Sequence, residues 1–94
     1  MTLEDKALKV IENYGVLAQL KYFQSEVFEL SEAIIKFENG IGDIKDIIDE
    51  TADVEFMLLQ FKEWYEILNE EVCDREVFKA DRQLERINNA NNPR

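Results

Sequence analysis

The 94-residue sequence lacks histidine and contains only one cysteine, one proline and three glycines. Without histidine, and with Cys73 as the single thiol, the chain has few of the ligands from which zinc sites are built and cannot form an internal disulfide. One unpaired thiol fits a reducing compartment, so we expect a cytoplasmic protein. No run of 18 apolar residues occurs, and the polar, acidic stretch 1–6 is unlike a signal peptide. We therefore expect neither a membrane span nor secretion.

Basic residues are also scarce, since 11 Lys and Arg stand against 21 Asp and Glu, for a net charge of −10. Nonspecific nucleic-acid binding depends on Lys and Arg at the phosphates, so this balance argues against nucleic acid as a partner. The acidic residues are concentrated in 41–71, which carries a net charge of −8, whereas 72–94 carries +1. The acidic segment and the mildly basic tail are thus expected to have different roles.

The few glycines and the absence of strand-like alternation predict a single all-α domain over residues 1–94. We expect four helices, at about 2–13, 16–38, 44–71 and 74–89. Gly15 should separate the first two, Gly40 should end the second, and Asp43 should cap the third. The tail 91–94 should fray.

The two central helices each carry an apolar seam whose spacing alternates between three and four residues. The first seam comprises Val16, Leu20, Phe23, Val27, Leu30, Ile34 and Phe37. The second comprises Ile44, Ile47, Thr51, Val54, Leu58, Phe61, Tyr65, Leu68 and Val72. Such seams are typical of helices that pack on each other, and the short turn between them predicts a long antiparallel hairpin whose seams form the core of a helical bundle.

Two carboxylate pairs, Glu26 with Glu29 and Glu50 with Asp53, flank these seams with the spacing i,i+3. At 100° per residue, both pairs lie on the same-signed side of their seams, so an antiparallel hairpin brings all four toward one groove. Tyr22 lies one turn before Glu26 on this flank. Four carboxylates form an all-oxygen site that suits Mg²⁺, which indicates a magnesium enzyme acting on phosphates. On a symmetric turn the two pairs would be out of level by about 6 Å.

The spacing alone is not specific, because seven acidic pairs in the chain have it. A solvated acidic helix face is therefore the alternative interpretation of these carboxylates.

The sequence around the pairs adds a resemblance. Residues 25–34 have the sequence Ser-Glu-Val-Phe-Glu-Leu-Ser-Glu-Ala-Ile, and residues 49–54 have Asp-Glu-Thr-Ala-Asp-Val. Over about residues 7–90 the chain resembles the MazG-type, all-α nucleoside triphosphate pyrophosphohydrolases, whose signature is Glu-Glu-x-x-Glu on one helix and Glu-x-x-Asp on the next. The departure is Ser25, which stands where the fullest signature has its first Glu.

The resemblance implies a metal site of Glu26, Glu29, Glu50 and Asp53 that holds Mg²⁺, with Mn²⁺ as a substitute. The reaction it implies converts a nucleoside or deoxynucleoside triphosphate and water to the monophosphate and pyrophosphate. We assign catalytic roles to Glu29 and Glu50, with Glu29 as the general base because its larger offset leaves it nearer solvent. The resemblance also implies a four-helix core completed by dimerisation, in a homodimer or tetramer. A domain of this size gains stability from such pairing.

The fourth predicted helix carries a basic stripe spaced 4,3,4. Its members are Arg75, Lys79, Arg82 and Arg86. Lys79 and Arg82 are our candidates for contacts with substrate phosphates, within a protomer or across a dimer, and a solvated face is the alternative. Tyr22 is a candidate to stack on the base, although aromatic residues in helices commonly serve packing.

Two rival functions remain for this sequence. The first is a non-catalytic acidic helical module that binds a protein and has kept the fold without the chemistry. The second is an acidic mimic of nucleic acid that blocks a basic surface, whose binding would weaken steeply with salt. Release of pyrophosphate that depends on Mg²⁺ separates the hydrolase from both.

Overall fold

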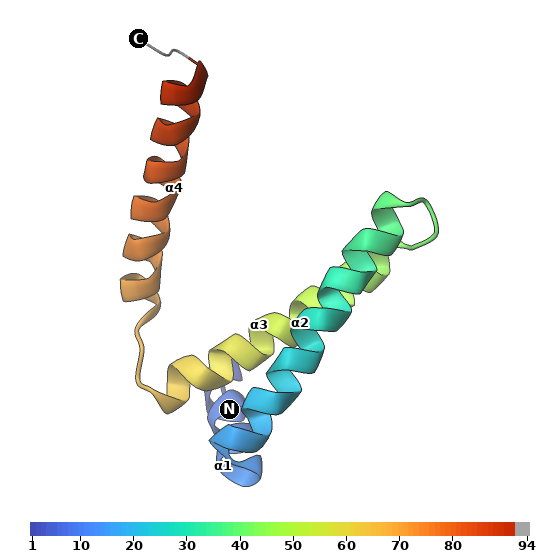
Figure 1. The fold of residues 1–94 in the computed structure, drawn as a ribbon. Coiled ribbons are helices and arrows are strands. Elements are labelled where there is room, and N and C mark those ends of the chain that lie inside the picture. Colours follow the sequence, from blue (N-terminus) through green and yellow to red (C-terminus); the bar gives the residue numbers. More distant parts are fainter. Residues whose placement is uncertain (92–94) are drawn as a thin grey trace.

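The computed structural model describes residues 1–91, and this part of the chain is all-helical, with no strand (Figure 1). Its elements are α1 (Leu3–Tyr14), α2 (Val16–Glu38), α3 (Ile44–Trp64) and α4 (Asn69–Asn91). The all-α class predicted from the sequence is confirmed, as are both ends of the second predicted helix. Of the tail that we expected to fray, Asn91 belongs to α4, and residues 92–94 lie outside the described part.

The first helix begins at a capping box. The Asp5 amide donates to the Thr2 hydroxyl at 3.0 Å, and the Thr2 amide donates to the Asp5 carboxylate at 3.1 Å. The helix ends at Gly15, whose φ of 91° is one that glycine adopts without a steric penalty. α2 begins at the next residue, so Gly15 is the sharp break that the sequence predicts.

The connection between α2 and α3 is short because a glycine ends one helix and an aspartate begins the next. The amides of Gly40 and Ile41 return to carbonyls of the last turn of α2, each at 3.0 Å, with Gly40 at φ 75°. This is the Schellman pattern, in which the chain reverses through a left-handed residue. Asp43 then accepts a hydrogen bond from the Lys45 amide at 2.9 Å and caps α3.

The predicted third helix, 44–71, is too long, because α3 ends at Trp64. The terminus is a second Schellman pattern: the Glu66 amide donates to the Glu63 carbonyl at 3.3 Å, and the Ile67 amide donates to the Lys62 carbonyl at 2.8 Å. Here the left-handed position is occupied by Glu66, at φ 56°, rather than by glycine. With no glycine to mark the reversal, the apolar spacing continues through it and predicts helix where the chain turns.

The fourth helix accordingly begins at Asn69, five residues before the predicted start at Asp74. The Glu71 carboxylate accepts from the Leu68 amide at 3.2 Å, which is one half of a capping box. The Lys62 ammonium also donates to the Asn69 side-chain oxygen at 3.3 Å, which ties the start of α4 to the end of α3.

The first three helices pack on one another, whereas α4 projects away from them with at most marginal contact (Figure 1). The buried apolar side chains are Ala7, Ile11, Ala33 and Met57, and none lies in α4. The Cα radius of gyration is 17.1 Å, against about 12 Å for a compact chain of this length. The described residues 1–91 therefore form a small three-helix core and one projecting helix.

The predicted seams are not the most buried positions of the pair formed by α2 and α3. On α2 the buried residues are Gln19, Glu26 and Ala33, seven residues apart, whereas Leu20 and Val27 of the seam are more than 40% exposed. The contact line is thus rotated by about 70° from the seam, toward the carboxylates. The seam is only partly used in the core, through contacts such as that of Phe23 with Phe61, whose ring centroids are 5.6 Å apart.

Each helix within residues 1–91 is too short or too polar to cross a membrane.

Candidate metal centre

Three of the four predicted carboxylates meet between α2 and α3. One oxygen from each of Glu26, Glu29 and Glu50 lies within 4.8 Å of the other two. The first two residues project from adjacent turns of α2, and the third projects from α3, which packs alongside. The offset of about 6 Å that a symmetric turn would give therefore does not separate them.

Burial distinguishes the members of this cluster. Glu26 is 4% exposed, Glu50 is half-buried and Glu29 is exposed. The Oε2 atoms of Glu26 and Glu50 are shielded from solvent and have no hydrogen-bond partner within residues 1–91. An unpartnered buried carboxylate oxygen is costly, and a bound cation is one of the few groups that offset the cost. These two oxygens are the strongest indication that the cluster could hold a cation.

The electrostatics agree with this geometry. Burial raises the pKa of Glu26, and the nearby charges of Asp53 and Glu29 raise it further, against an opposing interaction with the Tyr22 hydroxyl. Burial likewise raises the pKa of Glu50, followed by the charge of Glu29. Without a counterion, then, both buried carboxylates are destabilised in their ionised forms. A divalent cation would remove that penalty.

Asp53, the fourth predicted ligand, lies at the edge of the cluster. It is exposed and is not among the three residues whose oxygens approach within 4.8 Å, yet its charge contributes to the raised pKa of Glu26. Tyr22 is also at the site, because a hydrogen bond to Glu26 and the charge of that carboxylate raise the pKa of the Tyr22 hydroxyl. Its ring is half-exposed and available to a ligand.

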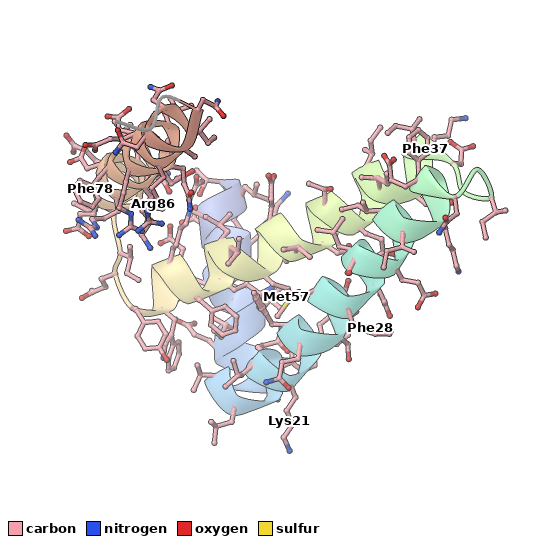
Figure 2. The ribbon with its side chains drawn as sticks, turned by 45° about the horizontal axis from the view of Figure 1, so that its top comes forward. Lys21, Phe28, Phe37, Met57, Phe78 and Arg86 are labelled. Atoms are coloured by element: carbon pink, nitrogen blue, oxygen red, sulfur yellow. The ribbon has the colours of Figure 1, made fainter. Side chains whose placement is uncertain are left out.

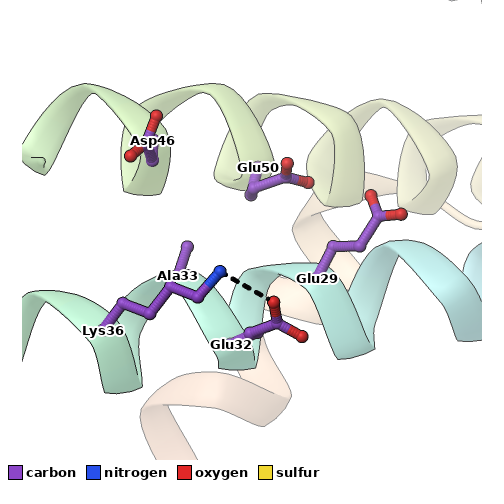
Figure 3. Close-up of a pocket in the computed structure, with 6 residues that line it drawn as sticks. All are labelled: Glu29, Glu32, Ala33, Lys36, Asp46 and Glu50. Carbon is purple, nitrogen blue, oxygen red and sulfur yellow. Dashed lines mark ion pairs between the residues drawn. The ribbon is translucent and has the colours of Figure 1, made fainter. Parts of the chain in front are cut away.

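A pocket of about 200 Å³ opens beside the cluster (Figure 3). It is lined by Glu29, Glu32, Ala33, Lys36, Asp46 and Glu50. The sequence analysis missed Glu32, Lys36 and Asp46 as site residues. The signal was present, because Glu32 follows Glu29 by one turn and Asp46 precedes Glu50 by one turn, so both extend the carboxylate flanks toward the connection.

A buried polar contact also joins the two helices. The Gln19 side-chain amide donates to the Gln60 side-chain oxygen at 2.8 Å, and the Gln60 amide lies 3.4 Å from the Met57 sulfur. Gln19 and Glu26 occupy the same buried line of α2, two turns apart. The sequence analysis did not identify this pair. Because buried amides must be satisfied, the contact favours one register of α2 against α3, and that register brings the carboxylates together.

The predicted phosphate contacts, Lys79 and Arg82, are not brought to the cluster within the protomer. Both lie on α4, which Figure 2 shows, at Phe78 and Arg86, well away from Phe28 and Met57. The Arg82 guanidinium instead lies 5.8 Å from the centroid of the Phe78 ring. Their predicted role stays a prediction.

A larger, open groove of about 1170 Å³ adjoins the other end of α3. It runs between α1, α3 and the first two turns of α4, and it is mainly apolar, with Phe56, Leu59 and Val72 among its lining residues and Asp53 among its charged ones. The exposed carboxylate of Asp53 therefore lies between the carboxylate cluster and an apolar surface.

The chain matches no family model, no curated protein and no solved structure. The site is accordingly interpreted from its own geometry: three convergent carboxylates, two of them with buried unpartnered oxygens, beside a small polar pocket.

Proposed function

We propose that this chain is a Mg²⁺-dependent nucleoside triphosphate pyrophosphohydrolase of the MazG type, which converts a nucleoside or deoxynucleoside triphosphate to the monophosphate and pyrophosphate. The observation that carries the proposal is the convergence of Glu26, Glu29 and Glu50, with two shielded oxygens that lack a partner within residues 1–91. An all-oxygen, strongly acidic donor set suits a hard divalent cation such as Mg²⁺, with Mn²⁺ as a substitute.

In this proposal Glu26 and Glu50 hold the cation from opposite helices, and Asp53 completes the set from the edge of the cluster. A bound Mg²⁺ supplies charge neutralisation of the triphosphate and acidifies a coordinated water. The buried, tightly packed position of Glu26 fixes its carboxylate, which suits a permanent ligand better than a group that must move.

Glu29 has the geometry of a general base, since it belongs to the cluster but is exposed to the groove. It takes a proton from the attacking water as the water oxygen bonds to the α-phosphorus. The bond from that phosphorus to the bridging oxygen breaks, and the bridging oxygen keeps the electron pair and departs in pyrophosphate. Glu50, which faces Glu29, orients the reacting groups as well as binding the metal.

The proposed assembly is an antiparallel hairpin of α2 and α3 whose four-helix core is completed by a second copy, in a dimer or tetramer. It is supported by seam residues that remain more than 40% exposed, including Leu20, Val27, Ile34 and Leu58. The accessible surface is 7596 Å², against about 5700 Å² for a compact monomer of this mass. Such pairing offers a route by which Lys79 and Arg82 of one copy reach the groove of another.

One observation favours the non-catalytic alternative, a helical protein-binding module. α4 presents an apolar stripe of Val77, Leu84 and Ile87, each more than half exposed, together with a basic stripe on another side. An amphipathic helix that is not packed in its own chain is a common recognition element. This alternative predicts binding without any metal-dependent turnover.

The test is release of pyrophosphate from a panel of ribo- and deoxyribonucleoside triphosphates, with Mg²⁺ and with EDTA. Glu50→Gln should lower turnover by about a hundredfold or more, a typical loss for a group that stabilises the transition state. Asp49→Asn is the matched control, because the Asp49 carboxylate, next to Glu50 in the sequence, is exposed and does not line the pocket. Folded protein that releases no pyrophosphate from any member of the panel would contradict the proposal and favour the binding module.

A further inference from the structure

The pocket beside the metal cluster contains one basic side chain among its described lining residues, Lys36 in the last turns of α2. The other charged groups that line it are the carboxylates of Glu29, Glu32, Asp46 and Glu50. Figure 3 shows the Lys36 side chain lying along the groove toward Glu32 rather than away from the pocket. The positively charged Lys36 side chain therefore lies at the end of the groove nearest the connection between α2 and α3.

The ion pair between Lys36 and Glu32 leaves the Lys36 ammonium available to a ligand. Its ammonium lies 2.9 Å from the Glu32 carboxylate, in an i,i+4 pair whose side chains are about half exposed. Exposed pairs of this kind contribute little to stability, so an incoming anion can replace the carboxylate at low cost. The pair holds the ammonium over the pocket, because side chains on a helix lean toward its N-terminus and hence from Lys36 back toward Glu29.

A triphosphate in this groove needs such a cation. It carries about four negative charges, of which one Mg²⁺ offsets two, and it enters a pocket that already has four carboxylates. The attacked α-phosphorus must lie at the cluster, where the proposed base and metal ligands are. The outer phosphates must then extend either toward Lys36 or toward Tyr22, and the first direction leads into the pocket, where Lys36 is the one basic side chain among the described lining residues.

We infer that Lys36 binds the β- and γ-phosphates, which leave as pyrophosphate, so that the phosphate chain points toward the connection between α2 and α3 and the nucleoside points toward Tyr22. This inference rests on the proposed function. As the bond between the α-phosphorus and the bridging oxygen breaks, negative charge grows on the departing oxygen, and the Lys36 ammonium stabilises it. Lys36 is thus a substrate-binding residue of this chain's own α2, independent of any contribution from α4.

The experiment measures binding in Mg²⁺ by calorimetry, with three probes and no turnover. The probes are inorganic pyrophosphate, a nucleoside triphosphate with a methylene group at the α,β-bridge, and the nucleoside monophosphate. Lys36→Gln should weaken the binding of pyrophosphate and of the methylene analogue by about tenfold or more, as expected for loss of a charge-assisted hydrogen bond. It should change the affinity for the monophosphate less than about threefold. Lys45→Gln is the matched control, because it removes the same charge near the same end of the groove from a side chain that does not line the pocket.

Two further variants separate a binding role from a structural one. Lys36→Arg keeps the charge and should retain most of the affinity for pyrophosphate. Glu32→Gln breaks the ion pair but frees the ammonium, so pyrophosphate should bind at least as tightly as to the unmodified chain. All variants should keep the helical circular dichroism signal and the affinity for Mg²⁺ alone.

Equal affinities in Lys36→Gln and the unmodified chain, equal losses in Lys36→Gln and Lys45→Gln, or a matching loss in Glu32→Gln would each overturn the inference. If the unmodified chain turns over triphosphates while any of these results holds, the proposed function stands and the role of Lys36 alone is wrong. If the unmodified chain binds no triphosphate in Mg²⁺, both are wrong.

Discussion

α3 and α4 are of similar length and both carry an apolar stripe, but they differ completely in what covers that stripe. α3 contributes Met57 and Gln60 to the buried core and packs against both α1 and α2, whereas no residue of α4, from 69 to 91, is buried. The difference lies in the connections, because a glycine turn returns α3 alongside α2, whereas the turn at Glu66 directs α4 away. An apolar stripe thus predicts a helix and a contact face, but the preceding turn decides whether the chain itself supplies the contact.

The largest expected effect comes from truncating matched aliphatic side chains in the two regions. Ile11 is fully buried, so Ile11→Ala should lower the free energy of unfolding by about 2–5 kcal/mol. Leu84 on α4 is 59% exposed, so Leu84→Ala should change it by no more than about 0.5 kcal/mol. Urea denaturation at two protein concentrations measures both. A comparable loss for Leu84→Ala, growing with concentration, would break the contrast and show that a second copy covers α4.

The next effect concerns the buried amide contact. Gln60→Leu leaves the Gln19 amide buried without its partner and should cost about 1–3 kcal/mol. Gln83→Leu, on exposed α4, should be nearly neutral. The double variant Gln19→Leu with Gln60→Leu removes both polar groups and should recover much of the loss. If Gln60→Leu proves neutral, the contact does not contribute to the register of α2 and α3.

A smaller effect is expected at the turn that sends α4 away. A non-glycine residue in the left-handed region is penalised by about 1–2 kcal/mol, so Glu66→Gly should raise the free energy of unfolding by about 1 kcal/mol. Gly40→Ala, at the equivalent position after α2, should lower it by a similar amount. Thermal unfolding followed by circular dichroism measures both shifts. Destabilisation by Glu66→Gly would indicate that residues 65–68 continue the helix in solution.

The smallest expected effect is on how the free energy of unfolding varies with pH. The pKa values of Glu26 and Glu50 in the folded chain lie above the ordinary value of 4.5. At a pH between 4.5 and those raised values, the folded chain therefore binds more protons than the unfolded chain. Without divalent cations, the part of the free energy of unfolding that depends on these groups should therefore rise as pH falls toward 4.5. Saturating Mg²⁺ or Glu26→Gln should flatten this slope. An unchanged slope in Glu26→Gln would mean that this carboxylate does not titrate as its burial implies.

Much of the fold could be predicted because its signals are local. Thr2, Gly15, Gly40 and Asp43 act through caps and turns that depend on a few neighbouring residues, and the corresponding helix ends were predicted to within a residue. Glu66 could not be predicted in this way, because glutamate rarely adopts the left-handed conformation and its presence therefore gives no signal of a reversal.

In the site, too, local signals could be predicted from the sequence and features that depend on tertiary packing could not. Helical periodicity placed Glu26, Glu29 and Glu50 on facing flanks, and the structure brings their oxygens together. Periodicity could not give the rotation of about 70° that buries Glu26, because that rotation depends on how α1, α2 and α3 share one core. Lys36 was overlooked for a related reason, since its importance depends on a pocket formed with the opposite helix.

The tightest backbone contact of the connection lies at Gly42. A Cβ atom at this position would lie 2.9 Å from the Phe37 amide nitrogen and 3.1 Å from the Lys36 Cβ, closer than such contacts allow. The backbone at Gly42 thus packs directly on Lys36 and Phe37 of α2, and Lys36 is the one basic side chain among the described residues that line the groove. Any larger residue at 42 would have to displace that turn of α2. The close approach at Gly42 therefore fixes where the connection packs on the end of α2, and we expect a side chain at position 42 to be tolerated far less well than at an ordinary surface loop position.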